Sequence, residues 1–264
     1  MTEHHGRFCW YELMTTDVDA AADFYGKVIG WTFGEGPTAS SAPGETPYRV
    51  LIAGQTGTGG IIAIRPEALA NGARPIWMGY IAVDDVDACA NLVVANGGGV
   101  HMGPAEIPAV GRFAVVTDPH GAFFQLFKPG MDGPALPSAS PEPGMFTWRE
   151  LMAGNGEEAM AFYAKMFGWG EGLGHAMGEM GVYQLFNDGQ TPDDLGGMMT
   201  RPPHIPVPIW NYYINVDSAE AGAARCKAAG GAVLNGPMRT PGDNWIVQAM
   251  DPQGALFCMT SLTP

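Results

Sequence analysis

Basic residues are scarce in this chain of 264 residues, where 13 Lys and Arg stand against 27 Asp and Glu and give a formal net charge of −14 at pH 7. Proteins that bind phosphate backbones or anionic membranes need clustered Lys and Arg. We therefore expect no nucleic-acid partner and no membrane partner. The sequence also has no apolar run long enough to cross a bilayer and no apolar signal region at its start, so the expected location is cytoplasmic.

Cysteine is also scarce. The chain has four cysteines and no Cys-x-x-Cys pair: Cys9, Cys89, Cys226 and Cys258. This spacing indicates neither a structural zinc site nor a disulfide framework, so reduced thiols are expected. Hydrophobic residues make up 46% of the chain and charged residues 15%, which is the composition of a globular protein rather than a disordered one.

What the sequence does contain is an internal repeat. Residues 8–14 (Phe-Cys-Trp-Tyr-Glu-Leu-Met) match residues 146–152 (Phe-Thr-Trp-Arg-Glu-Leu-Met), and both segments alternate apolar and polar positions as a strand does. A helix-like run follows each of them. Asp17 and the matching Asn155 suit the N-caps of these helices. The two helix-like runs end in Gly-Trp, at residues 30–31 and 168–169.

Each half then restarts with a second strand and helix and closes with an Asp-Pro-x-Gly-Ala turn, at 118–122 and at 251–255. Strand-helix-strand units of this kind predict an α+β fold with helices outside curved sheets. The proline-rich segment 131–144 has the composition of a linker. We therefore expect one domain at 1–130 and a second at 145–264.

Together, the Phe-Tyr-x-x-x-x-Gly-Trp helix ends, the strand-helix starts at 81–88 and 214–217 and the terminal Asp-Pro-x-Gly-Ala turns resemble the vicinal oxygen chelate superfamily. This superfamily includes glyoxalases, bleomycin-resistance proteins and extradiol dioxygenases. The tandem arrangement with its paired Trp-x-Glu-Leu openings is similar to two-domain bacterial hydroxylase-like proteins and to a mycobacterial secreted antigen of about this size. The resemblance implies two tandem glyoxalase-like domains, each of two paired βαβββ modules whose U-shaped mixed or antiparallel sheet encloses a cavity. It leaves open whether modules pair within or across the halves.

The resemblance also implies a divalent metal, held by the first and last strands of each unit. On this sequence the corresponding positions carry Trp10, Met78, Trp148 and Asn211 on the opening strands, and Gln125 and Cys258 on closing strands. Hard divalent ions need oxygen or imidazole donors, which Trp and Met lack. We therefore predict no cofactor and no metal site, and expect a divalent metal only if this alignment is out of register.

Two carboxylates are the candidate catalytic residues. Strand alternation places Glu12 on the same face as Trp10, and Glu150 on the same face as Trp148. Burial of a carboxylate beside an indole ring should raise its pKa, which favours a general base or acid at neutral pH. The alternative is structural, in which each glutamate pairs with an arginine or caps a backbone group.

The remaining candidates are expected to line the cavities. Tyr80 and Tyr213 share a face with Met78 and Asn211, and each phenol would either orient a ligand or simply pack. Asn211 makes the second cavity more polar than the first. Cys258, in an apolar strand, is expected to be an inert buried thiol at the cavity wall.

The predicted function is the binding or metal-independent processing of a small organic molecule. One alternative is a metal-dependent lyase or dioxygenase of the glyoxalase type, and another is a non-catalytic drug-sequestering or scaffold protein. A monomer or homodimer is expected. The terminal His4 and His5 are expected to lie in a frayed segment.

Overall fold

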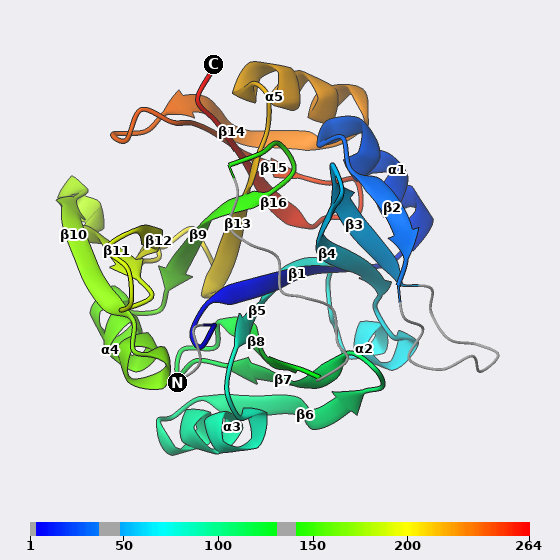
Figure 1. Ribbon diagram of the computed structural model, residues 1–264. Helices are drawn as coiled ribbons and strands as arrows, with labels where there is room; N and C mark the ends of the chain where they lie inside the picture. Colours follow the sequence, from blue (N-terminus) through cyan, green and yellow to red (C-terminus); the bar gives the residue numbers. More distant parts are fainter. Residues whose placement is uncertain (1–3, 37–47, 131–140) are drawn as a thin grey trace. The chain divides into compact units, whose positions relative to one another are not determined.

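The computed structural model describes residues 4–36, 48–130 and 141–264, so most of the predicted linker lies outside the described residues. The strands form two eight-stranded sheets with the same connectivity (Figure 1), in the orders β2-β3-β4-β1-β5-β8-β7-β6 and β10-β11-β12-β9-β13-β16-β15-β14. Both sheets are mixed, because each combines parallel and antiparallel pairs. The predicted α+β fold class is confirmed.

Within the described residues, the chain repeats one module of a strand, a helix and three further strands. The first half contains β1 (Phe8–Thr15), α1 (Val18–Val28), β2 (Thr32–Glu35), β3 (Arg49–Ala53), β4 (Thr56–Ala63), the short helix α2 (Pro66–Ala70), β5 (Ile76–Ala82), α3 (Val86–Ala95), β6 (Gly99–Ile107), β7 (Gly111–Thr117) and β8 (Phe123–Pro129). The second half contains β9 (Phe146–Ala153), α4 (Gly156–Phe167), β10 (Gly170–Ala176), a 3-10 turn (Gly178–Met180), β11 (Val182–Asn187), β12 (Asp194–Thr200), β13 (Ile209–Asn215), α5 (Ala219–Ala228), β14 (Ala232–Arg239), β15 (Trp245–Met250) and β16 (Leu256–Ser261).

The predicted helix starts are confirmed. The Asp17 carboxylate accepts a hydrogen bond from the backbone N–H of Ala20, and the Asn155 side chain accepts from two backbone N–H groups in the first turn of α4. These bonds satisfy donors that a helix start would otherwise leave unpaired. Residues 66–70 form the short helix α2, which begins with a proline, since the first helical turn needs no N–H partner from that residue.

In each module the opening strand runs parallel to the closing strand. The register of each pair determines which residue of the closing strand lies opposite each candidate site residue. Glu12 on β1 lies opposite Gly60 on β4, and Glu150 on β9 lies opposite Gly197 on β12. In the other two modules, Tyr80 is opposite Gln125 and Tyr213 is opposite Cys258.

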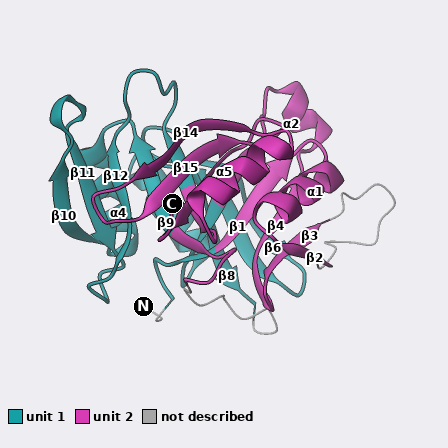
Figure 2. Cartoon of the chain, turned by 90° about the horizontal axis from the view of Figure 1, so that it is seen from above, with its two compact units in different colours: residues 1–9, 79–136, 148–211 teal, residues 10–78, 137–147, 212–264 magenta. Residues whose placement is uncertain are grey.

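The chain divides into two compact units, coloured in Figure 2: unit 1 contains residues 1–9, 79–136 and 148–211, and unit 2 contains residues 10–78, 137–147 and 212–264. Each unit thus combines a module from the first half with a module from the second. The predicted domain boundaries follow the sequence repeat instead, and they stay a prediction.

A buried tyrosine joins the two modules of unit 2. The phenol of Tyr25, on α1, donates a hydrogen bond to Asp251 Oδ2 at 3.1 Å and accepts one from Trp77 Nε1 at 3.0 Å. Asp251 also accepts backbone hydrogen bonds within its own turn, although burial raises the pKa of its carboxyl group. The helix motif and the Asp-Pro turn therefore meet across the halves of the sequence.

The equivalent contact in unit 1 follows the same pattern. Tyr163 on α4 donates to Asp118 Oδ2 at 3.4 Å and accepts from Trp210 Nε1 at 3.0 Å. Burial likewise raises the pKa of Asp118. The repeat thus extends to the contacts that hold modules of different halves together.

The expectation that His4 and His5 lie in a frayed segment is wrong, because the His4 carbonyl accepts a hydrogen bond from the backbone N–H of Arg7 at 3.1 Å and His5 Nδ1 lies 3.4 Å from Asp84 Oδ2. The carbonyl of Gly6 accepts a hydrogen bond from Trp169 Nε1 at 2.7 Å, and Arg7 forms an ion pair with Asp188 at 2.7 Å. Because the Asp188 side chain is only 1% exposed, its charge requires such a partner. Among the described residues, no helix is long and apolar enough to span a membrane.

Candidate functional site

Unit 2 contains a chain of three polar side chains that starts on β1. Trp10 Nε1 donates a hydrogen bond to Tyr48 Oη at 2.8 Å, and Tyr48 is in turn hydrogen-bonded to Glu12. Glu12 is 8% exposed. Strand alternation correctly placed Trp10 and Glu12 on one face, because both reach the same phenol.

Unit 1 contains the equivalent cluster, with one further member. Trp148 Nε1 donates to Tyr183 Oη at 2.9 Å, and Tyr183 donates to Glu150 Oε2 at 3.4 Å. Asn211 Nδ2 donates to Glu150 Oε1 at 3.2 Å. We call these residues, Trp148, Glu150, Tyr183 and Asn211, the Glu150 cluster. Glu150 is 8% exposed and Asn211 is 5% exposed, so the carboxylate is largely removed from bulk water, and it accepts hydrogen bonds from the Tyr183 phenol and the Asn211 amide.

The tyrosines of both clusters lie across a glycine. A Cβ atom at Gly60 would lie 2.0 Å from Tyr48 Oη, and one at Gly197 would lie 2.1 Å from Tyr183 Cε1. Real side chains do not approach so closely, so only glycine at these positions leaves room for the ring. The glycine opposite each glutamate therefore allows the phenol to reach the carboxylate.

Tyr48 and Tyr183 were missed by the sequence reasoning. The sequence offered one indication of their role, which is their position. Each lies near the start of the extended segment that pairs with the glycine-containing strand of its module, β4 or β12. Burial raises the pKa of Tyr48 well above its ordinary 10.0, and the neighbouring Glu12 charge raises it further. The phenol therefore remains protonated and can donate to Glu12.

The two clusters differ at one position of the repeat. Asn211 follows the buried Trp210, whereas the matching residue after Trp77 is Met78, which is also buried. A thioether cannot donate a hydrogen bond. Only the Glu150 cluster therefore has an amide at this place.

The other predicted site residues form two separate pairs. In unit 1, Tyr80 packs edge-on against Phe127, while the register partner Gln125 is 1% exposed and its Nε2 has no hydrogen-bond partner in the described residues. In unit 2, the phenol of Tyr213 accepts a hydrogen bond from Gln248 Nε2 at 3.2 Å. Cys258 is fully buried on β16, and the four cysteines, all of which are described, form no disulfide.

The donor set does not fit a bound divalent metal. Over residues 4–36, 48–130 and 141–264, no three or more His, Cys, Asp or Glu side chains come together in a way that could hold a metal ion. The opening strands contribute one carboxylate to each cluster, and its neighbours there are indole and phenol groups, joined in the Glu150 cluster by a single amide, that of Asn211.

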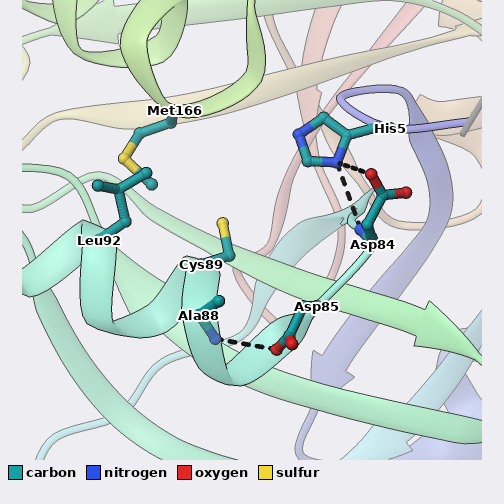
Figure 3. Close-up of a pocket in the computed structure, with 7 residues that line it drawn as sticks. All are labelled: His5, Asp84, Asp85, Ala88, Cys89, Leu92 and Met166. Atoms are coloured by element: carbon teal, nitrogen blue, oxygen red, sulfur yellow. Dashed lines mark hydrogen bonds and ion pairs between the residues drawn. The ribbon is translucent and has the colours of Figure 1, made fainter. Parts of the chain in front are cut away.

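Unit 1 also has a pocket of about 260 Å³ away from the Glu150 cluster (Figure 3), lined by His5, Asp84, Asp85, Ala88, Cys89, Leu92 and Met166. His5 Nδ1 lies 3.4 Å from Asp84 Oδ2, so the polar groups here pair with each other. Burial raises the pKa of the Cys89 thiol to about 12, which leaves it without thiolate character at neutral pH. This pocket offers little chemistry beyond packing.

The sequence of this chain is similar to the sequences of known proteins. This chain is 35% identical over 258 residues to "Putative glyoxylase CFP32" of Mycobacterium tuberculosis, covering 97% of this chain and 94% of that protein. It is 31% identical over 280 residues to the anthracycline biosynthesis protein DnrV of Streptomyces peucetius, with the same two coverages.

Solved structures agree on the fold. The Mn(II)-bound glyoxalase from Novosphingobium aromaticivorans matches with a TM-score of 0.65 at 19% identity, over 99% of this chain and 83% of that chain. The 2,2',3-trihydroxybiphenyl 1,2-dioxygenase from Sphingomonas wittichii matches with a TM-score of 0.67 at 12% identity, over 97% and 90%. The family model matches residues 7–126 and 146–259, and the chain therefore belongs to the Glyoxalase/Bleomycin resistance protein/Dioxygenase superfamily, with two tandem glyoxalase-like domains.

Proposed function

We propose that the chain binds a small organic molecule at the Glu150 cluster and processes it without the family's metal, with Glu150 as the general base. The observation that carries this proposal is the placement of one buried carboxylate between two neutral donors, Tyr183 and Asn211. Such donors hold a carboxylate in one orientation.

The chemistry available to Glu150 is proton transfer. One carboxylate oxygen would take a proton from an acidic C–H or O–H group of the ligand and return it at a neighbouring atom. Tyr183 is itself held by Trp148 Nε1, so the indole orients the phenol and the phenol orients the carboxylate. Trp148 and Tyr183 are half-buried and offer flat apolar surfaces to the ligand.

The names of two relatives support a small organic ligand, because one is a glyoxylase-type protein and the other takes part in anthracycline biosynthesis. The second candidate is a metal-dependent lyase or dioxygenase, favoured by the shared fold of the Mn(II)-bound glyoxalase. The donor set described above argues against it.

The test uses the full chain after dialysis against a chelator, with elemental analysis to measure any remaining metal. A thermal-shift screen of small aromatic and carbonyl compounds identifies ligands, because binding to the native state raises the unfolding temperature. Turnover of each ligand is then followed by mass spectrometry. Glu150→Gln should abolish turnover, whereas the matched variant Glu12→Gln should retain it.

Two results would contradict the proposal as a whole, and a third would refute its catalytic part. One is a stoichiometric metal whose removal eliminates both ligand binding and turnover, which would favour the lyase or dioxygenase. The other is unchanged ligand binding and turnover in Glu150→Gln. Binding that is lost in this variant without any turnover in the wild type would identify a sequestering protein and refute the catalytic part.

A further inference from the structure

The amide of Asn211 has a fixed orientation. The hydrogen-bond partners of an amide decide which end is the NH₂ group and which is the oxygen. An ionised carboxylate can only accept hydrogen bonds, so the group 3.2 Å from Glu150 Oε1 must be the NH₂ end. The other end, Oδ1, is therefore an acceptor.

This acceptor is not satisfied. Asn211 Oδ1 is buried and has no hydrogen-bond partner within the described part of the chain. A buried polar atom without a partner costs about 1–3 kcal/mol. The atom is attached to the same amide that contacts Glu150, so an unfilled acceptor and a carboxylate lie side by side.

The repeat provides an internal comparison. In the first half the carboxylate, phenol and indole are all present as Glu12, Tyr48 and Trp10. Met78 stands where Asn211 stands in the second half. The hydrogen-bonded chain from the indole to the carboxylate therefore forms without the amide, and Asn211 is not needed to build it.

We infer that the Glu150 cluster recognises a protonated amine carried by a flat apolar group, an inference that rests on the proposed function of this site. An ammonium group has several N–H donors and a positive charge, so it can donate to Asn211 Oδ1 and to the Glu150 carboxylate at once. Its apolar part would lie against Trp148 and Tyr183, whose rings also attract cations. The acidic chain, with a net charge of −14, favours the approach of cations.

The experiment compares three probes of similar shape on the full chain by isothermal titration calorimetry. They are 1-naphthylmethylammonium, the neutral 1-naphthalenemethanol and the anionic 1-naphthoate. Hydrogen bonds that involve a charged group contribute more than neutral ones. The ammonium should therefore bind at least about ten-fold more tightly than the alcohol, and naphthoate should bind most weakly.

Asn211→Met, which copies the first half, should weaken ammonium binding more than alcohol binding, because the charged donor loses the stronger hydrogen bond, and should so remove this preference for the ammonium. The matched control Met78→Leu should alter neither Kd. If Asn211→Met does not fold, Glu150→Gln provides a second test, because loss of the negative charge should also weaken ammonium binding by about ten-fold.

Equal binding of ammonium and alcohol by the wild type would overturn the inference about the amine. The proposed function would survive that result if Glu150→Gln still weakened the binding of either probe. Unchanged ammonium binding in Asn211→Met would also overturn the inference about the amine. If no probe bound the wild type, the inference about the amine would fail, whereas the proposed function would still be decided by the thermal-shift screen and by turnover in Glu150→Gln.

Discussion

Tyr25→Phe tests the buried contact that joins the two modules of unit 2. The substitution removes one oxygen atom that accepts from Trp77 at 3.0 Å and donates to Asp251 at 3.1 Å. Tyr25 is 0% exposed, and its two partners are each 4% exposed. A buried group left without its partner costs about 1–3 kcal/mol. Asp251 keeps its backbone donors, so we expect a total loss of about 2–3 kcal/mol in the free energy of unfolding.

The assay is urea unfolding of the full chain, followed by tryptophan fluorescence. Tyr163→Phe is the equivalent variant in unit 1, and it should cost less because its phenol lies farther from its carboxylate, at 3.4 Å. A loss below about 0.5 kcal/mol in Tyr25→Phe, within the range of ordinary surface substitutions, would refute the view that this contact stabilises the unit.

The pH dependence of the same variant gives an independent check. Burial raises the pKa of Asp251 above 3.8, and the Tyr25 hydrogen bond partly opposes this rise. The folded state therefore binds this proton more tightly than the unfolded state, and stability falls as the pH rises from 3.8 through the folded-state pKa. Without the phenol the fall should be larger, and a smaller fall would contradict the assigned cause.

Three further predictions concern the clusters and the thiols. Gly60→Ala should displace the Tyr48 ring and lower the free energy of unfolding by about 1–3 kcal/mol, whereas Gly57→Ala on the same strand, whose Cβ would have its nearest contact at 3.5 Å, should cost less in the same urea assay. The ultraviolet absorbance titrations of the wild type and Tyr48→Phe should coincide through pH 10.0, because the pKa of Tyr48 lies well above this value; earlier phenolate formation in the wild type would contradict this. Cys89 and Cys226, whose pKa values burial raises from 9.0 to about 12 and about 11, should resist a thiol reagent at neutral pH and react after denaturation, and rapid labelling of the folded chain would refute their inertness.

Much of the fold was predictable, because its determinants are local. The alternation of residues 8–14 defines a strand face, and it grouped Trp10 with Glu12, both of which are hydrogen-bonded to Tyr48. Asp17 and Asn155 were recognisable as helix caps, since a cap acts on backbone groups two or three residues away. Because the sequence repeats, an element predicted in one half also predicted the matching element in the other.

The parts that could not be predicted depend on contacts distant in the sequence. Tyr25 and Asp251 are 226 residues apart, and no local pattern indicates that a helix of the first half binds a turn of the second. Tyr48 joins its cluster through space left by Gly60, which periodicity does not reveal. The open acceptor of Asn211 emerges only once its neighbours are known.

The tyrosine contacts across the halves also bear on how such a chain could arise. Tyr25 in the first half donates a hydrogen bond to Asp251 in the second, and Tyr163 in the second half donates to Asp118 in the first. Two separate copies of an ancestral half could have made the same reciprocal pair of contacts, but only at a concentration high enough for them to associate. Fusion into one polypeptide makes association intramolecular and independent of protein concentration. It also frees the two halves to diverge, as Met78 and Asn211 have done.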